Sequence, residues 1–280
     1  MLSLQHNFYI IYFISSTLFI NIIVKNVISL LNMNIAIIGY GNMGRMIEQV
    51  AIERGHTVKC IIDPNEQKAT HREINESALN NVDVSMDFSL PTVVLGNLEK
   101  LAKLKKNVVI GTTGWYKDIE EAKRIVKMYE IGLIYANNFS LGVNIFYRIV
   151  ESSAKIFNNI EEYDTYVYEL HHRKKLDTPS GTAKTIGDIL LKNINRKRKL
   201  VFEQLNRKIN EDELHVASIR SGSIPGTHIV GFDSESDTIE LKHTARNRKG
   251  FALGAIMAGE WIKNKRGVYT IDEMLKDILE

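Results

Sequence analysis

The residues best suited to acid–base chemistry are His171 and His172, which follow Glu169 closely in the chain. Histidine changes its protonation state near neutral pH, so an imidazole is well suited to give or take a proton. The run Arg173-Lys174-Lys175 comes directly after the pair and would attract an anionic substrate. The stretch therefore predicts a site that protonates an anion.

A strand and a helix are expected to position these side chains. Residues 165–169 are β-branched and aromatic, which is typical of a strand, and residues 182–191 carry apolar side chains at helical spacing. Thr178 is expected to cap this helix, with a proline at its first position. Because the N-terminal end of a helix attracts anions, Gly181 and Thr182 are candidate carboxylate-binding residues.

Taken one at a time, each of these residues is more often an ordinary loop residue than a functional one. The complete run, however, is similar to the signature of the 4-hydroxy-tetrahydrodipicolinate reductase (dihydrodipicolinate reductase) family, E-x-H-H-x-x-K-x-D-x-P-S-G-T-A. Every specified position of that signature is filled between Glu169 and Ala183. The resemblance implies that His171 is the general acid, that Lys175 assists proton delivery and binds substrate, and that His172, Gly181 and Thr182 hold its carboxylates.

A glycine-rich loop near residue 40 predicts a dinucleotide-binding fold. A buried strand at residues 34–38 leads into G-x-G-x-x-G, a helix follows, and the next strand ends at Asp63. Asp63 falls about 20 positions after the glycines, where this fold places the carboxylate that binds ribose. The candidate cofactor-binding residues are Gly39, Gly41, Asn42, Met43, Gly44 and Asp63.

Strands and helices continue to alternate as far as residue 135, which predicts a parallel, Rossmann-type sheet. Two loops in this region are similar to the family's G-T-T-G and A-x-N-F-S-x-G-V-N segments. The resemblance implies that these loops contact the nicotinamide half of the cofactor, through Gly111, Thr112, Thr113, Ala136, Asn137, Asn138 and Phe139.

The second half of the chain is expected to form an α+β domain. A helix at residues 140–158 is followed by three strand patterns, which suggest a mixed or antiparallel sheet. The segment from Arg220 to His228 is similar to the family's R-x-G-x-x-x-G-x-H, which implies a place near the active site. The expected division is residues 33–138 plus 249–280 for dinucleotide binding and residues 139–248 for substrate binding and oligomerisation.

The cofactor preference is predicted from Asp63 and Pro64. A carboxylate at this position favours the ribose hydroxyl of NAD and repels the 2′-phosphate of NADP. The family often has an arginine directly after the acidic residue, and Pro64 takes its place here. NADH is therefore favoured over NADPH, with Lys59 and Lys68 as cations that could compensate.

Composition limits the alternatives. A hydrophobic fraction of 44% is enough for a sizeable core, and a formal charge of +3 is too small to indicate nucleic acid. The single Cys60 fits a reducing compartment. The basic run 195–199 is expected to be a solvated helix end. No metal site is expected, because the histidines have no third ligand at zinc spacing.

Residues 1–32 are anomalous. The stretch from Phe8 to Val24 is apolar and uncharged, which raises the alternative of a signal peptide or membrane anchor. It lacks a basic start and a clear cleavage site, and its composition is that of translated AT-rich upstream sequence. Met33 is therefore the expected natural start, and membrane attachment is not expected.

The resemblance implies an NAD(P)H-dependent enzyme of the diaminopimelate–lysine pathway that acts in the cytoplasm on a cyclic dicarboxylate, as a homotetramer. Two alternatives stay open. One is an amino-acid dehydrogenase of similar two-domain plan, acting on meso-diaminopimelate or aspartate. The other is a non-catalytic dinucleotide sensor. Neither has a reason to carry the run from His171 to Thr182.

Overall fold

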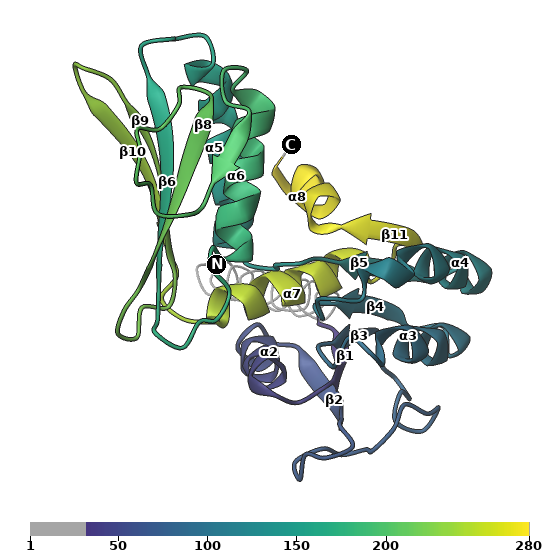
Figure 1. Cartoon of the computed structure of the whole chain (residues 1–280). Helices are drawn as coiled ribbons and strands as arrows, with labels where there is room; N and C mark the ends of the chain where they lie inside the picture. Colours follow the sequence, from purple (N-terminus) through teal and green to yellow (C-terminus); the bar gives the residue numbers. More distant parts are fainter. Residues whose placement is uncertain (1–31, 280) are drawn as a thin grey trace, which may run out of the picture. The chain divides into compact units, whose positions relative to one another are not determined.

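The computed structural model describes residues 32–279, which form two compact units (Figure 1). Unit 1 runs as far as Tyr135 and also includes Ile256–Met274. Unit 2 comprises Ala136–Ala255 and the residues from Leu275 onward. Except for Asn32, the expectation for residues 1–32 concerns residues outside the described range. Within that range, no helix combines the length and the apolar character needed to span a membrane.

Unit 1 is built on a six-stranded sheet in the order β11-β5-β4-β3-β1-β2. Every neighbouring pair is parallel, so the predicted Rossmann-type sheet is confirmed. The strands are β1 (Asn34–Ile38), β2 (Thr57–Ile62), β3 (Val84–Asp87), β4 (Asn107–Ile110), β5 (Gly132–Tyr135) and β11 (Gly267–Thr270). The helices are α2 (Asn42–Glu53), α3 (Val94–Lys103), η1 (Tyr116–Asp118) and α4 (Ile119–Tyr129). Two further helices, α7 (Lys249–Ile262) and α8 (Ile271–Leu279), continue from one unit into the other.

The central strands β1, β3, β4 and β5 of unit 1 are mostly apolar and almost fully buried, because helices cover both faces of the sheet. Leu98 of α3 and Ala122 of α4 belong to the core on one face. On the other face α2 packs beside β1, and a β-carbon at Gly44 would lie 2.3 Å from the Gly39 carbonyl oxygen and 3.4 Å from the Ile37 side chain. Within the same unit, Gly259 of α7 packs against Met86 of β3. The loops at the carboxyl ends of β1 and β3 therefore lie at the edge where this fold binds its ligands.

Unit 2 is built on a five-stranded sheet in the order β10-β9-β6-β8-β7. Strand β6 pairs antiparallel with β9 and parallel with β8, so the predicted mixed sheet is confirmed. The strands are β6 (Asp164–His171), β7 (Lys199–Val201), β8 (Glu213–Arg220), β9 (Thr227–Asp233) and β10 (Thr238–Thr244). The helices α5 (Leu141–Phe157) and α6 (Gly181–Asn193) pack on one face of this sheet, as Figure 1 shows.

Burial alternates along β6, so every second side chain points to the core. Val167 packs with apolar residues of α5 and α6, and Glu169 and His171 follow it on the same buried face. Tyr166 and Tyr168 point to the opposite face, where their rings stack with centroids 6.2 Å apart. The period of two along a strand therefore places a carboxylate and an imidazole at the end of a hydrophobic row.

The predicted N-cap of the helix after the signature was wrong. Helix α6 begins at Gly181 and is capped by Ser180 rather than Thr178, because the Ser180 hydroxyl accepts the Ala183 N–H at 3.2 Å. Helix α3 begins at Val94, and a turn closed by Val93 N–H and the Leu90 carbonyl precedes it.

The basic run 195–199 is not simply a solvated helix end. Lys197 is buried, and its ammonium group contacts Asp164 at 2.6 Å and donates to the carbonyls of Glu211 and Glu213. These partners compensate the buried positive charge of Lys197. Through them Lys197 links the loop before β7 to the starts of β6 and β8.

Candidate functional site

Glu169 lies at the centre of a buried polar cluster in unit 2, and strand register assembles that cluster. In the β6–β8 pair Glu169 lies opposite Ser218, and His171 lies opposite Arg220. In the β6–β9 pair Glu169 lies opposite His228. Residues directly opposite on neighbouring strands have side chains on the same face. Three strands therefore bring five polar side chains together beside the start of α6.

One oxygen of the Glu169 carboxylate is fully engaged. Oε1 accepts hydrogen bonds from Ser180 N–H at 2.9 Å, from the Ser218 hydroxyl at 2.9 Å and from Arg220 Nη2 at 2.8 Å. Glu169 has no exposed surface, so an unpaired charge here would be strongly destabilising. Burial alone would raise its pKa, but the interactions with His228, Ser180 and Arg220 hold the pKa of this carboxyl well below its usual range. Glu169 is therefore a fixed anion.

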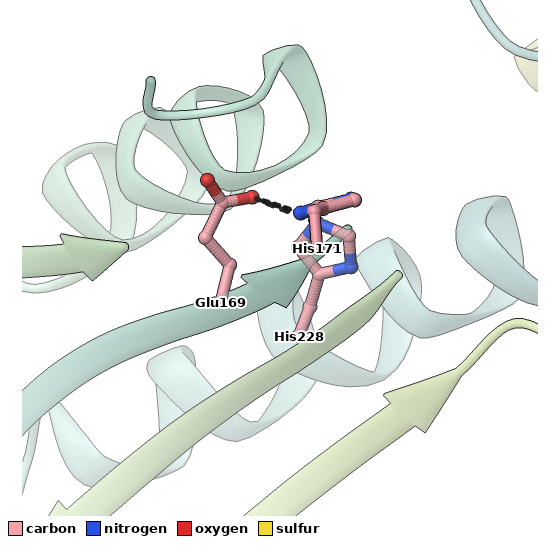
Figure 2. A group of neighbouring side chains, drawn as sticks. All are labelled: Glu169, His171 and His228. Atoms are coloured by element: carbon pink, nitrogen blue, oxygen red, sulfur yellow. Dashed lines mark ion pairs between the residues drawn. The ribbon is translucent and has the colours of Figure 1, made fainter. Parts of the chain in front are cut away.

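The second oxygen faces two imidazoles, as Figure 2 shows. Oε2 lies 3.1 Å from His171 Nδ1 and 3.5 Å from His228 Nε2. The two rings are nearly perpendicular, with centroids 5.2 Å apart. The 3.1 Å contact is an ion-pair distance that does not meet hydrogen-bond geometry, so neither Oε2 nor His171 Nδ1 has a hydrogen-bond partner among the described residues. Contacts of this kind at catalytic sites tighten when a substrate binds.

His171 is held in its neutral form. Burial lowers its pKa to about 4, the charges of Lys175 and Arg220 and the neighbouring His228 act in the same direction, and the Glu169 carboxylate opposes them. His243, which lies opposite His228 on β10, also has a lowered pKa because of burial. The site therefore combines the neutral imidazole of His171 with one ionised carboxylate, and has cations at its border.

The loop between β8 and β9 closes over His171. His171 accepts the Ser221 N–H through its backbone carbonyl, and Gly226 lies against the ring. A β-carbon at Gly226 would be 2.9 Å from His171 Nε2, and the backbone φ of Gly226 is +149°. Glycine is needed here both for the backbone conformation and for the space beside Nε2.

The other residues predicted to bind substrate lie along the same loop and helix. Lys175 is partly buried and forms an ion pair with Asp177 at 2.8 Å. Gly181 and Thr182 occupy the first turn of α6, whose backbone N–H groups have no partner within the helix. His172 follows His171 directly at the end of β6 and is half-buried. The signature is thus distributed over one strand end, one loop and one helix start.

Glu169, His171 and His228 are close enough to be considered as metal ligands, since one ligand atom from each lies within 4.8 Å of the others. The sequence did not indicate this group, because His228 is far away in the chain. Arg220 already contributes a full positive charge to the same carboxylate. That charge opposes a second cation at Oε2, and the expectation of no metal stays a prediction.

Unit 1 contains a cavity of about 710 Å³ at the carboxyl ends of β1 and β2. Four residues predicted to bind cofactor line it, namely Gly39, Gly41, Asn42 and Asp63. Gly39 has φ +84° and its β-carbon position is 2.6 Å from the Phe88 carbonyl oxygen, so the tight turn requires glycine. No atom lies within 4 Å of a β-carbon at Gly41, which leaves open space beside the loop. The cavity fits the phosphates of a dinucleotide at the start of α2.

Asp63 is fixed by backbone hydrogen bonds. Its carboxylate accepts the N–H groups of Tyr40, Asn65 and Glu66 at 2.9, 2.9 and 3.1 Å. Burial acts to raise its pKa, but these hydrogen bonds and the charge of Arg72 lower it overall. Asp63 therefore presents a permanent negative charge to the cavity.

The cations that line this cavity are Arg45, Arg72 and Lys100 rather than the expected Lys59 and Lys68. Arg45 is paired with Glu66. Arg72 Nη1 donates to the carbonyls of Asp63, Pro64 and Glu66 at 3.2, 3.4 and 2.6 Å. Arg45 and Arg72 are thus already engaged within the protein.

The remaining cofactor candidates lie elsewhere. Met43 and Gly44 belong to the first turn of α2, and Gly111, Thr112 and Thr113 follow β4. Residues 136–139 follow β5 and belong to unit 2, where Asn138 caps its own turn by accepting the Ser140 N–H at 2.8 Å.

The sequence assigned no individual role to Ser180, Ser218, Arg220 or His228, although all four contact Glu169 or its neighbours. Three of them lie in segments similar to family motifs, and those motifs were the available signal. Ser218 lies outside both, and only its register opposite Glu169 identifies it.

Comparison with known proteins agrees with this arrangement. Two family models match the chain, the N-terminal part of dihydrodipicolinate reductase over residues 33–139 and the C-terminal part over residues 142–275. A 4-hydroxy-tetrahydrodipicolinate reductase from Christiangramia forsetii is 39% identical over 250 residues, which is 89% of this chain and 100% of that protein. One from Archaeoglobus fulgidus is 36% identical and covers 87% of this chain and 100% of its own length.

Among solved structures, the dipicolinate-bound dihydrodipicolinate reductase from Paenisporosarcina sp. TG-14 has the same fold. The TM-score is 0.71 at 20% sequence identity, covering 86% of this chain and 99% of that one. From the family models and the identities to curated relatives, the chain belongs to the dihydrodipicolinate reductase family of oxidoreductases.

Proposed function

We propose that this chain reduces 4-hydroxy-tetrahydrodipicolinate to tetrahydrodipicolinate with NAD(P)H, within diaminopimelate and lysine biosynthesis, and that His171 supplies the proton. The observation that carries the role of His171 is its position 3.1 Å from the fixed Glu169 carboxylate, at the strand end next to the start of α6. An imidazole beside an anion-binding helix end is suited to protonate an anionic substrate.

In this proposal the substrate carboxylates are held by Lys175, by His172 and by the backbone N–H groups of Gly181 and Thr182. The solved relative binds dipicolinate, a dicarboxylate, and this supports the substrate class. Lys175 keeps its ammonium group ordered through Asp177. A substrate carboxylate would replace that partner at similar cost, because both are charge-assisted contacts.

Substrate binding would also allow His171 to carry the proton that a general acid needs. A general acid must carry its proton, whereas burial and the nearby cations keep the pKa of His171 at about 4. A dicarboxylate bound next to Lys175 would counter the positive charges that disfavour the imidazolium form. His171 then gains its proton when the substrate is present.

The nicotinamide cofactor supplies the hydride when it is bound. The residues proposed to hold it are those of the glycine-rich loop and Asp63, with the loops at residues 111–113 and 136–139 for its nicotinamide half. We propose that NADH is preferred, because Asp63 is a fixed anion and the nearby Arg45 and Arg72 are already engaged. A 2′-phosphate would meet that anion while both arginines are held by other groups of the protein.

We further propose that residues 33–138 and 249–280 bind the dinucleotide, that residues 139–248 bind substrate, and that four copies assemble through the unit 2 sheets. The sheet face opposite α5 and α6 carries Ile219, which is 48% exposed, on the same face as Tyr166 and Tyr168. Exposed apolar sheet faces commonly pair in symmetric oligomers. The proposed place of action is the cytoplasm, where the single buried Cys60 stays reduced.

A coupled assay tests the proposed activity. Dihydrodipicolinate synthase generates the substrate in the same reaction mixture. The loss of NADH absorbance and the loss of NADPH absorbance are followed in separate assays. Turnover with either cofactor supports the proposal. If neither absorbance changes above the rate without enzyme, the proposed reaction is wrong.

A further inference from the structure

The Glu169 carboxylate cannot turn freely. Its Oε1 accepts three hydrogen bonds, from the N-cap residue Ser180 of α6 and from Ser218 and Arg220 of β8. These donors come from two different elements, so rotating the carboxylate would break all of them together. The orientation of Oε2 is therefore fixed before any ligand arrives.

Oε2 can only accept a hydrogen bond, because Glu169 is ionised. It faces His171 Nδ1 at 3.1 Å, and no other hydrogen-bond partner of that nitrogen exists among the described residues. In neutral histidine one ring nitrogen carries the proton and the other does not. A carboxylate at this distance favours the form in which Nδ1 carries it.

The opposite ring nitrogen lies against backbone rather than a side chain. His171 Nε2 is next to Gly226, where even a single added carbon would approach to 2.9 Å. The nitrogen that exchanges a proton with substrate must not be tied to Glu169. Nε2 meets this condition, since Nδ1 is the ring nitrogen that faces Oε2.

We infer that Glu169 is a positioning residue that keeps the Nδ1 proton on His171 and so reserves Nε2 for proton transfer to the substrate. This inference rests on the proposed role of His171 as the proton donor. In this inference Glu169 does not touch the substrate. It contributes to the reaction by holding the proton of His171 on Nδ1.

The charges around His171 agree with this role. The groups that shift its pKa come from β6, from the loop after it, and from β8 and β9, and Glu169 alone among them raises it. Lys175, Arg220 and His228 lower the pKa of His171. His243 lies opposite His228 on β10. Glu169 is thus the group that stabilises the imidazolium formed before proton transfer.

Replacing Glu169 by glutamine gives a sharp test because the amide has two unlike ends. The three donors at Oε1 require an oxygen there, so the amide NH₂ must take the place of Oε2. An NH₂ group donates to His171 Nδ1, which forces the proton onto Nε2. In serine proteases the equivalent aspartate-to-asparagine change installs the wrong tautomer and lowers kcat about 10⁴-fold.

The experiment uses the full-length protein labelled with ¹⁵N-histidine, and long-range ¹H–¹⁵N spectra report the tautomer of each ring. His171→Gln identifies the His171 signals by their loss. We expect Nδ1–H in the wild-type protein at neutral pH and Nε2–H in Glu169→Gln. We also expect kcat of Glu169→Gln to fall about 10²- to 10⁴-fold with KM changed only a few-fold, since the substrate contacts remain.

The pH profile of kcat provides a readout that a purely structural role would not move. Removing the carboxylate charge lowers the pKa of His171. The limb on which activity falls with rising pH should therefore move to lower pH in Glu169→Gln. If that limb keeps its position, Glu169 does not act on His171.

Glu213→Gln is the matched control. Glu213 is also buried in this sheet, on β8, and is held by Arg207 and by the Asn210 N–H, outside the histidine cluster. Its replacement should lower the melting temperature without altering the His171 tautomer or the pH profile. A general effect of losing a buried carboxylate would appear in both variants.

The outcomes separate the inference from the proposed function. Wild-type protein with Nε2–H on His171 overturns the inference, and this measurement stands even if Glu169→Gln fails to fold. A folded Glu169→Gln that keeps the wild-type tautomer overturns it as well. A changed tautomer with unchanged kcat would instead overturn His171 as the proton donor.

Discussion

Gly226 lies against the imidazole of His171, so that a β-carbon at Gly226 would be 2.9 Å from Nε2. Two residues 55 positions apart are joined because the loop before β9 folds back over the end of β6. The contact places the Gly226 backbone beside the ring nitrogen that we propose to face the substrate.

Gly226→Ala should therefore lower kcat at least about tenfold, because the added methyl group displaces the His171 ring from its position. Gly222→Ala is the control, since Gly222 also has a positive φ in the same loop but nothing lies within 4 Å of its β-carbon position. Both variants should lose some stability through backbone strain. Steady-state kinetics alongside melting curves would check this, and equal loss of turnover in both would contradict the contact's importance.

His171→Gln should lower turnover about 10²- to 10⁴-fold, because the side chain keeps a polar group but loses its titratable proton. Binding of NADH, measured by fluorescence titration, should stay near the wild-type value. A thermal melt with and without NADH controls for folding. Near wild-type turnover with the authentic substrate would show that another group donates the proton.

Lys175→Ala should lower turnover and also weaken substrate binding, because a charge that faces a substrate carboxylate is removed. Lys174→Ala removes an exposed charge next to it and serves as the control. We expect KM to rise at least about tenfold in the first variant and less than about twofold in the second. Equal effects would indicate general attraction of the anion rather than a specific contact.

Glu66→Gln should improve the use of NADPH, because it removes a negative charge and releases Arg45 from its ion pair at the cavity. We expect KM for NADPH to fall several-fold and KM for NADH to change little. Glu73→Gln also removes a charge from the cavity lining and is the control. If both variants improve NADPH use equally, the charge alone matters and Arg45 has no special part.

The pH dependence of stability offers a further test of the buried His171. Its pKa of about 4 lies below the ordinary value of 6.5, so neutral His171 stabilises the folded state above pH 6.5. As the pH falls from 6.5 towards 4, the unfolded chain takes up a proton that the folded protein does not, and the free energy of unfolding decreases. At 1.36 kcal/mol per pKa unit this loss is about 3 kcal/mol.

His171→Gln removes this titration, so its free energy of unfolding should fall less over the same range. Urea denaturation at several pH values between 7 and 4 would measure the difference between the two proteins. Parallel curves for wild type and variant would mean that the pKa of His171 is not lowered in the folded protein.

Local patterns predicted β6 and α6 well, since alternation and helical spacing can be seen within a few residues. They missed β7 and β11, which have three and four residues. β11 is a strand because it pairs with β5, far away in the chain, and β7 is one because it pairs with β8. Tertiary context decides such segments more than propensity does.

The same limit applies to the site. The signature gave Glu169 and His171, but the surroundings of the carboxylate depend on the register of three strands. A shift by one residue would turn Glu169 to the other face of the sheet. No spacing in the sequence specifies that Ser218 rather than Ala217 lies opposite Glu169, or that Lys197 is buried beside Asp164.

Strand β11 closes the edge of the unit 1 sheet, although more than a hundred residues of unit 2 separate it in the chain from β5, its partner. During synthesis the ribosome releases the nucleotide-binding strands long before Gly267–Thr270 emerges. Until then β5 has a bare edge that could pair with another nascent chain. A stop codon that removes only the last twenty residues should therefore cause aggregation rather than a simple loss of activity.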